Sequence, residues 1–317
     1  MRELHLIVPG LASWRASPHG ERVLLPGLER LLARGVGVGG ETNLADALCS
    51  AFDFPPRGPL AFATAAYDGL NADSGYWLRA DPVHLQVGMR GLTLLDAERV
   101  GLVQSESESL AASLRPLFEE AGWQLFAPVP SRWYGHPAQT LDLRTTPLDQ
   151  VTTRHVHSAM PAGPDAARAM RLVNDAQILL HDHPVNQERE RQGLAAINSL
   201  WLWGGGKKAK AGRRFDLVLA GQVEALALAR LSSSPHVSCP AGLHDLPHAA
   251  RVLLLLPEFL PHATAAEASC LDAAWFTPLL QHLRRGHIRR AVLTLCEPEG
   301  GSVQLGMGDA WKLWMGG

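Results

Sequence analysis

Short apolar runs alternate with segments of helical spacing at both ends of this chain. The run from Leu4 to Val8 ends at Pro9-Gly10 and predicts a strand, and the leucines between Leu24 and Arg34 recur at the spacing of one helix face. Towards the other end the pattern predicts strands over 215–220, 251–256 and 290–295 and helices over 224–231 and 271–285. Alternating strands and helices favour a mainly parallel sheet with helices on both faces, so the sequence predicts an α/β fold.

The middle of the chain carries a second set of predicted elements. Helical spacing indicates helices over 44–52, 106–121, 166–182 and after Pro184, and apolar alternation indicates strands over 83–87, 92–95, 123–127 and 197–203. We expect a sharp turn at 204–206, an exposed basic loop as far as 214, and terminal strands over 303–305 and 311–314. The sequence therefore predicts a core domain of residues 1–80 and 210–317 with an inserted, lid-like subdomain of residues 81–209.

Composition narrows the class of protein. The chain has 317 residues, of which 46% are hydrophobic and 19% charged, with a formal net charge of -2, which is the balance of an ordered globular protein. A near-neutral charge argues against a nucleic-acid partner, because phosphate binding leaves a basic footprint. The apolar runs are too short for a membrane span or a signal peptide, so we expect a cytoplasmic protein with no membrane partner. The four cysteines are widely spaced and contain no close pair, so we expect reduced thiols and no four-cysteine zinc site: Cys49, Cys239, Cys270 and Cys296.

Three kinds of segment contain residue types that could bind a ligand or a metal, and each also has a purely structural explanation. Gly204–Gly206 followed by Lys207 and Lys208 has the glycines and charge of an anion-binding turn, or of a flexible hairpin with solvated lysines. His181-Asp182-His183, with His155 and His157, has metal-ligand types, or forms a helix end whose histidines bond locally. Two polar-aromatic stretches that we place in loops either contact a ligand or pack the core: Arg132-Trp133-Tyr134 and Ala80–His84.

One block resembles a known family. It reads His183-Pro-Val-Asn186-x-x-Arg189, then Gly193-Leu194, then Asn198-x-x-x-x-Trp-Gly-Gly-Gly206, and it is similar to a stretch of the archaeal-type cofactor-independent phosphoglycerate mutases. Weaker matches over 44–59 and 215–230 keep the family's order along the chain. The resemblance implies a truncated member of the alkaline phosphatase-like superfamily. It also implies two manganese or zinc ions and a serine that carries the phosphoryl group.

The chain departs from that family where the metal ligands and the nucleophile belong. Val8-Pro9-Gly10-Leu11 stands in place of an Asp-Gly-Met-Gly-Asp motif, and Gly39–Asn43 in place of Gly-Ser-Asp. Pro257–Thr264 and Cys296-Glu297 replace the family's later Asp and His motifs. The weak candidates for a substitute catalytic role are Glu41, Glu258, His262 and Glu297. We therefore expect no metal and no cofactor, because paired metals are what neutralises charge in this kind of phosphoryl transfer.

Over its whole length the chain, including Ala80–Leu85 and Arg132–Tyr134, looks still more like the bacterial RpfE-type regulatory proteins. Our hypothesis is a non-catalytic phosphoglycerate mutase-like protein with a regulatory, partner-binding or ligand-binding role. The alternative is an active phosphoryl-transfer enzyme, a mutase or phosphatase, with a rebuilt site and bound Mn or Zn. We expect a small phosphorylated ligand or a protein partner. If an anion pocket survives, we expect its residues to be Asn186, Arg189, Asn198 and Lys207, since arginine suits phosphate geometry.

Overall fold

The computed structural model describes residues 1–16, 23–39, 43–55, 58–88, 91–151, 156–210, 212–296 and 300–311. The chain divides into two compact units, the first made of Met1–Pro56 with Ala211–Gly317 and the second of Arg57–Lys210. The sequence placed 57–80 in the core domain instead. These residues belong to the second unit because the helix Leu60–Tyr67 packs against its sheet and the strand that begins at Tyr76 is part of that sheet.

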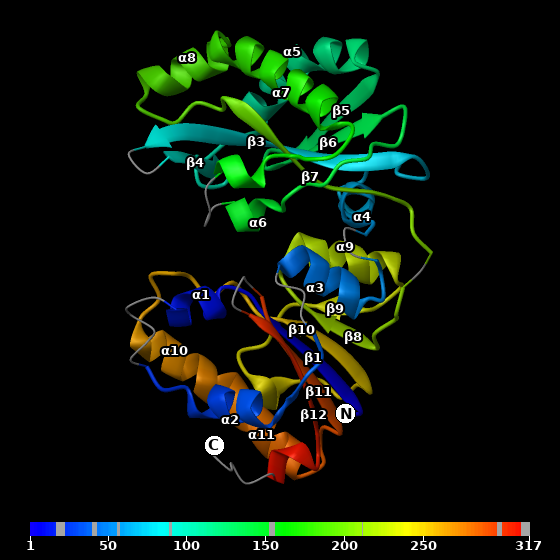
Figure 1. Cartoon of the computed structure of the whole chain (residues 1–317), viewed down its shortest axis with the longest axis vertical. Helices are drawn as coiled ribbons and strands as arrows, with labels where there is room; N and C mark the ends of the chain where they lie inside the picture. The colour runs from blue at the N-terminus through cyan, green and yellow to red at the C-terminus, as the bar shows by residue number, and fades with distance from the viewer. Residues whose placement is uncertain are drawn as a thin grey trace. The chain divides into compact units, whose positions relative to one another are not determined.

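The first unit is built on a seven-stranded sheet of order β2-β12-β11-β1-β10-β8-β9 (Figure 1). Its strands are β1 (Glu3–Val8), β2 (Val36–Gly37), β8 (Leu217–Leu219), β9 (His236–Val237), β10 (Arg251–Leu255), β11 (Arg290–Leu295) and β12 (Gly301–Gly306). β1 lies between β10 and β11 and is parallel to both, and β12 is antiparallel to its neighbours. The central strands are apolar runs because both faces of a parallel sheet are covered. The predicted α/β fold with a mainly parallel sheet is confirmed.

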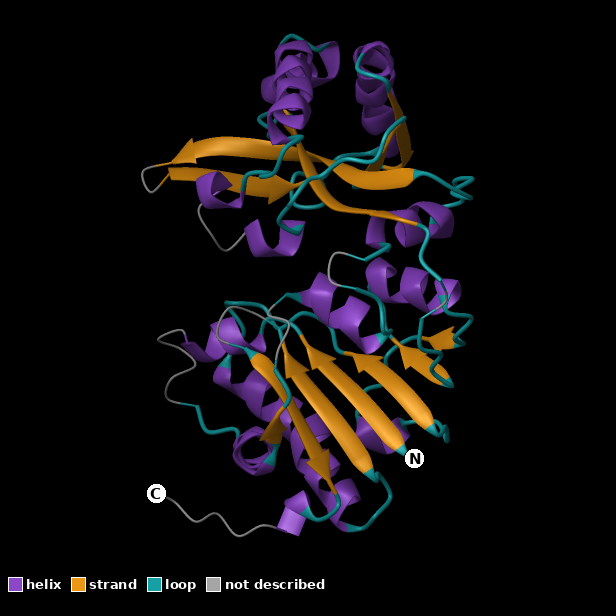
Figure 2. Ribbon diagram, turned by 45° about the vertical axis from the view of Figure 1, so that its right-hand side comes forward, coloured by secondary structure: helices purple, strands orange, loops and turns teal. Residues whose placement is uncertain are grey.

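Helices cover both faces of this sheet (Figure 2). They are α1 (Leu11–Ala16), α2 (Pro26–Arg34), α3 (Leu44–Ala51), α9 (Val223–Leu231), α10 (Ala265–Leu271) and α11 (Thr277–Arg284), with a π-helical turn over Asp272–Phe276 and short 3₁₀ turns over Leu243–Asp245 and Asp309–Trp311. Leu4 and Leu6 of β1 pack with α2 and α11, whereas His5 and Ile7 point to the face that carries α3. Because neighbouring residues of a strand point to opposite faces, His5 and Ile7 stand outside this apolar core.

The second unit is an antiparallel sheet under a layer of helices (Figure 1). Its strands are β3 (Tyr76–Gly88), β4 (Gly91–Asp96), β5 (Trp123–Val129), β6 (Arg132–Pro137) and β7 (Ser199–Lys207). Its helices are α4 (Leu60–Tyr67), α5 (Gln104–Glu120), α6 (Leu148–Val151), α7 (Ala166–His181) and α8 (Pro184–Arg191), with a 3₁₀ turn over Val156–Ala159. The order is β4-β3-β6-β5, with β7 also paired to β3. Apolar side chains of α5, α7 and the sheet form one core.

Two local predictions for this unit are wrong. Gly204–Gly206 lie within β7 and not in a turn. Two of these positions need glycine because their neighbours are close: a Cβ on Gly205 would stand 2.0 Å from the Tyr76 hydroxyl, and one on Gly206 would stand 2.5 Å from the Gly58 carbonyl. The two polar-aromatic stretches placed in loops are in strands: Ala80–His84 is part of β3, and the Arg132–Tyr134 stretch is part of β6. The core-packing alternative is confirmed for Arg132–Tyr134, since Trp133 and Tyr134 are both 0% exposed. Trp311 lies in a 3₁₀ turn, and residues 312–314 of the predicted terminal strand lie outside the described residues.

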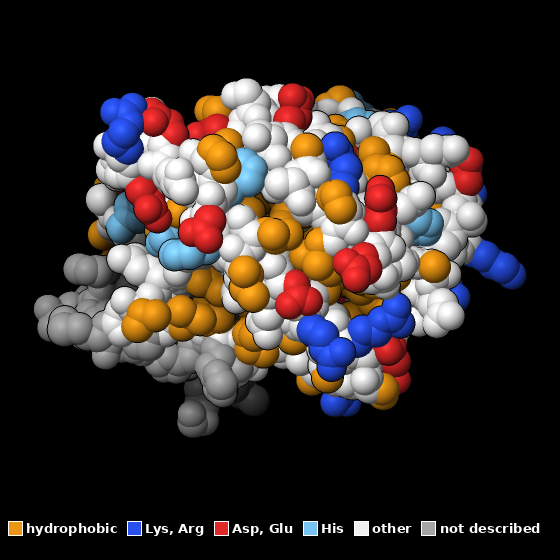
Figure 3. All heavy atoms as spheres, turned by 90° about the horizontal axis from the view of Figure 1, so that it is seen from above, with side chains coloured by type: hydrophobic (Ala, Val, Ile, Leu, Met, Phe, Trp, Pro, Cys, Tyr) orange, Lys and Arg blue, Asp and Glu red, His pale blue; other side chains and the backbone are white. Residues whose placement is uncertain are grey.

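The surface of the molecule shows no single-sign field in the view of Figure 3, where acidic and basic side chains are interspersed with apolar ones. The exposed apolar side chains of the second unit include Ile178 and Leu179 of α7. Among the helices within the described ranges, none combines the length and hydrophobicity that crossing a bilayer requires.

Candidate functional site

The loops that follow β1 and β10 meet each other through their backbones. The amide N of Phe259, four residues after β10, donates to the Pro9 carbonyl at 2.9 Å. Gly10 has φ of +82°, and a Cβ there would stand 2.1 Å from the Phe259 carbonyl oxygen. Only glycine fits this combination of a left-handed backbone and direct backbone contact.

Aromatic packing completes this contact between the loops. Trp14 of α1 is 0% exposed, and its indole Nε1 donates to the Ala263 carbonyl at 2.7 Å. Its ring meets Phe259 edge-on, with 5.2 Å between the ring centroids. The space beside the ends of β1 and β10 is therefore filled by backbone and by two aromatic rings.

The block that carries the family resemblance forms α8 and the strand after it, and its polar residues bond within the protein. The Asn186 amide is 1% exposed, donates to the carbonyls of Leu180 and Ile197 at 2.7 Å each, and accepts from the Ile197 amide N at 2.8 Å. Asn198 makes a matching pair of bonds to Leu85 of β3, at 2.7 Å to its N–H and 2.9 Å to its carbonyl.

Arg189 is 1% exposed, and its guanidinium donates hydrogen bonds to three oxygens of the protein. Its Nη1 donates to a Glu106 carboxylate oxygen at 2.6 Å, its Nη2 to the Val100 carbonyl at 2.5 Å and its Nε to the Ala195 carbonyl at 2.9 Å. These bonds tie α8 to the start of α5.

The four residues predicted to share an anion pocket do not all come together. Asn186 and Asn198 line a cavity of about 220 Å³ whose one carboxylate is Glu190. Lys207 is exposed at the opposite end of β7 from Asn198, roughly 25–30 Å along the strand at its usual rise per residue. A ligand role for this set stays a prediction.

The predicted histidine cluster is spread over a helix end. The side chains of His181 and Asp182 are 84% and 85% exposed and lie 3.9 Å apart. His183 is the N-cap of α8 and accepts from the Val185 amide N at 3.2 Å. Partial burial lowers the pKa of His183, which suits an acceptor nitrogen. His155 and the side chain of His157 lie outside the described residues.

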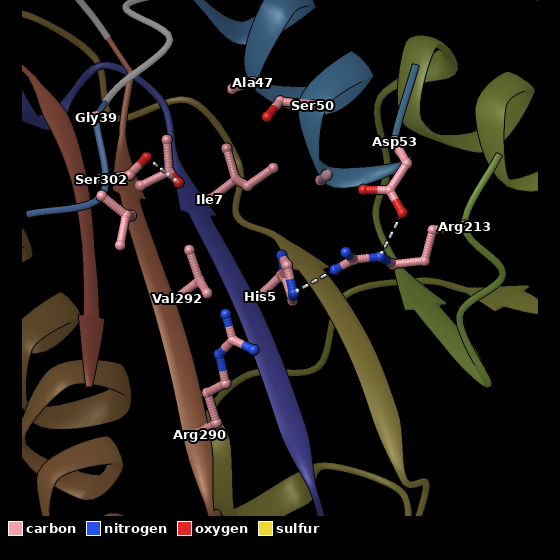
Figure 4. Close-up of a pocket in the computed structure, with 13 residues that line it drawn as sticks. His5, Ile7, Gly39, Ala47, Ser50, Asp53, Arg213, Arg290, Val292 and Ser302 are labelled. Atoms are coloured by element: carbon pink, nitrogen blue, oxygen red, sulfur yellow. Dashed lines mark hydrogen bonds and ion pairs between the residues drawn. The ribbon is translucent and has the colours of Figure 1, made fainter. Parts of the chain in front are cut away.

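A cavity of about 430 Å³ opens on the α3 face of the first unit's sheet (Figure 4). Its described lining residues are His5, Ile7, Val38, Gly39, Ala47, Ser50, Ala51, Asp53, Arg213, Arg290, Val292, Thr294 and Ser302. Its size falls within the usual range of small-molecule sites. Charged groups gather at one end, apolar Ile7 and Val292 form the floor, and Thr294 and Ser302 share a hydroxyl–hydroxyl bond of 2.8 Å at the other end.

The charged end is organised around one carboxylate oxygen. Glu3 Oε1 lies 3.1 Å from His5 Nε2, 3.9 Å from Arg213 Nη1 and 3.8 Å from Arg290 Nη1. Arg213 also donates from Nε to Asp53 at 3.0 Å. Burial lowers the pKa of His5, and the nearby arginines add to that effect while Glu3 opposes it. Sequence reasoning missed this group; the one available signal was the period-two alternation that places Glu3, His5 and Ile7 on one face.

Comparisons with known proteins point in one direction. The chain is 25% identical over 191 residues to a probable 2,3-bisphosphoglycerate-independent phosphoglycerate mutase of Geobacter sulfurreducens, covering 57% of this chain and 46% of that one. It is 23% identical over 227 residues to the corresponding mutase of Methanosarcina mazei, covering 66% and 56%. The chain thus spans about half the length of these curated relatives. No family model matches it.

A solved structure shares the fold. The PH0037 protein of Pyrococcus horikoshii matches with a TM-score of 0.50 and 17% identity, covering 96% of this chain and 87% of that one. At this identity the likeness shows a shared α/β fold and no more. The chain is similar to the cofactor-independent phosphoglycerate mutases at low identity. The resemblance to RpfE-type regulatory proteins stays a prediction.

The described residues at the strand ends do not fit the pair of metal ions that this resemblance implies. Glu258 and His262 are exposed on the segment after β10, and Glu41 and Glu297 lie outside the described residues. Within the described part of the chain, no three His, Cys, Asp or Glu side chains gather in a way that could hold a metal ion. A carbonyl, an indole and a phenyl ring are poor replacements for the carboxylates and imidazoles that Mn and Zn take.

We expect Gly10→Ala to destabilise the first unit because the new methyl group meets the Phe259 carbonyl in a strained backbone. The free energy of unfolding should fall by about 2–4 kcal/mol in urea titrations. Gly69→Ala is the matched control, because Gly69 has φ of +88° and nothing within 4 Å of its Cβ position, so it carries backbone strain alone. Equal losses in the two variants would show that the contact with the Phe259 carbonyl adds nothing to the backbone strain and would contradict the close approach of the two loops.

Proposed function

We propose that this chain is a non-catalytic phosphoglycerate mutase-like protein that acts by binding a ligand or a protein partner. One observation carries the proposal: the loops after β1 and β10 touch through their backbones at Gly10 and Phe259. Phosphoryl transfer of the kind that the relatives' names imply needs charge stabilisation on the transferred group. The contact leaves backbone and aromatic rings at the strand ends instead.

The proposal includes no metal or other cofactor. It keeps a small phosphorylated ligand or a protein as the partner and excludes nucleic acid and membrane. The regulatory role implied by the RpfE-type resemblance fits a binding protein, since such a role needs affinity rather than turnover.

The test measures activity and metal content on the full chain. Purified protein is incubated with excess Mn²⁺ or Zn²⁺, passed through a desalting column and analysed by elemental mass spectrometry. Conversion of 3-phosphoglycerate to 2-phosphoglycerate is followed with a coupled enolase assay, and p-nitrophenyl phosphate hydrolysis is followed at 405 nm, with an active mutase as positive control. We expect well under one metal ion per chain and no turnover above the blank.

The alternative of an active enzyme makes an opposite prediction. Turnover that requires metal, and that is lost in both Glu258→Gln and His262→Asn, would overturn the proposal and identify a rebuilt site. Turnover that survives both substitutions would overturn it as well and place the chemistry elsewhere. Stoichiometric metal without turnover would contradict the conclusion that the residues at the strand ends do not fit a pair of metal ions.

A further inference from the structure

The cavity on the α3 face of the first unit's sheet is lined by a histidine with one ring nitrogen that makes no hydrogen bond within the described structure. His5 is 8% exposed, and its Nε2 lies 3.1 Å from Glu3 Oε1 and 3.3 Å from Arg213 Nη1. Within the described ranges its Nδ1 has no hydrogen-bond partner, although His5 lines the cavity. Nδ1 is therefore open to water or to a group bound in the cavity.

Two guanidinium groups lie on either side of the His5 side chain and have N–H donors that make no hydrogen bond within the described residues. Figure 4 shows His5 between Arg213, on the segment before β8, and Arg290, at the start of β11. An arginine has five N–H donors. Within the described structure, Arg213 donates from Nε to Asp53 at 3.0 Å, and Arg290 donates from Nη2 to Gln304 at 2.6 Å. The remaining donors are available to an oxyanion.

The local charges favour an anion over a cation. Glu3 is drawn into contact with His5 and both arginines, which lowers the pKa of its carboxyl despite its partial burial, and its charge is thereby neutralised. Asp53, the carboxylate of the described lining, has a 55% exposed side chain and is solvated. Arg290, whose side chain is 52% exposed, presents the most accessible cationic group of the described lining.

We propose that this cavity binds a small organic oxyanion, a phosphate ester or a carboxylate, with Arg213 and Arg290 on its oxygens, His5 Nδ1 as a third donor and its apolar body on Ile7 and Val292. This deepens the proposed binding role and rests on it. With His5 Nε2–H donating to Glu3, an anion at Nδ1 requires a proton there, so binding takes up one proton and leaves an imidazolium between two negative groups.

The sign of the pH dependence follows from that proton. The free protein has a lowered His5 pKa. A bound anion raises that pKa, so affinity is highest below the free-state pKa and declines as pH rises towards the bound-state pKa. Within the described structure, the charged groups around His5 are Glu3 of β1, Asp53 after α3, Arg213 before β8 and Arg290 of β11.

The experiment uses isothermal titration calorimetry on the full chain with three probes: inorganic phosphate, phenyl phosphate and benzoate. We expect phenyl phosphate to bind more tightly than inorganic phosphate, because its ring covers the apolar floor. Arg213→Gln and Arg290→Gln should each weaken binding about tenfold or more. Arg251→Gln is the matched control, since Arg251 and Arg290 are both in register with Glu3 on its two neighbouring strands, but only Arg290 lines the cavity.

Proton uptake is measured with benzoate, which stays ionised across pH 5.5–8, in buffers of different ionisation enthalpy. His5→Gln should abolish the uptake and flatten the pH profile, and circular dichroism confirms that each variant is folded. Benzoate binding supports a carboxylate ligand, and binding of the phosphates alone supports a phosphate ester. Failure of all three probes to bind, or equal weakening by Arg251→Gln, overturns the inference. Mutase turnover would overturn the proposed function and leave the cavity's affinity unaffected, so the two failures are distinguishable.

Discussion

Replacing Asp81 by Asn should lower the free energy of unfolding by about 3–5 kcal/mol, because it leaves the buried Arg79 guanidinium without its negatively charged partner. Asp81 is 1% exposed and Arg79 is 3% exposed. Arg79 donates to the Asp81 carboxylate from Nε at 2.9 Å and from Nη2 at 2.8 Å. Burial raises the pKa of Asp81, and donors from Arg79, Trp203 Nε1 and the Trp133 amide N oppose that effect. The Arg79 guanidinium also lies over the Tyr134 and Trp203 rings, at 5.5 and 4.9 Å from their centroids.

The measurement is urea unfolding followed by tryptophan fluorescence, which Trp133 and Trp203 report from within the network. Glu188→Gln is the control, because its ion pair with Arg191 on α8 is exposed to solvent, and we expect its midpoint to match that of the unmodified chain. An unchanged midpoint in Asp81→Asn would mean that the buried pair contributes nothing to stability.

The elements of the first unit could be predicted because its strands are apolar runs between helices. β1, β10 and β11 are mostly buried, and each was visible as a short, mainly apolar run. The order of the strands was not visible, because pairing is set by contacts between segments far apart in the sequence. His5 and Arg290 meet only because β1 pairs with β11 in the register that places Glu3 beside Arg290.

The glycines of β7 were misread for a related reason. Glycine next to lysine is typical of a turn, and nothing in the local sequence indicates Tyr76 and Gly58, whose closeness excludes a Cβ at Gly205 and Gly206. The resemblance identified Asn186 and Arg189 as special positions. It could not say whether their partners were a ligand or the chain itself, because carbonyls such as those of Val100 and Ala195 carry no sequence signal.

We expect Arg189→Ala to destabilise the second unit by about 3–5 kcal/mol, since it removes a buried cation and leaves two carbonyls without a donor. The carbonyls of Val100 and Ala195 each receive an N–H from Arg189, and the Glu106 carboxylate receives a third. Arg189→Lys should recover part of the loss, because an ammonium group can reach one of these oxygens but cannot span all three.

Arg191→Ala separates this role from a general effect of charge on the helix. Arg191 lies two residues further along α8, and its side chain is 72% exposed, so we expect an unchanged urea midpoint.

The same variants distinguish a structural arginine from a ligand-binding one. If Arg189 held an anion instead, Arg189→Ala would keep the midpoint in phosphate-free buffer and lose only the stabilisation that added phosphate gives to the unmodified chain. Because its three bonds are already made within the protein, we expect the large loss of stability with no phosphate present.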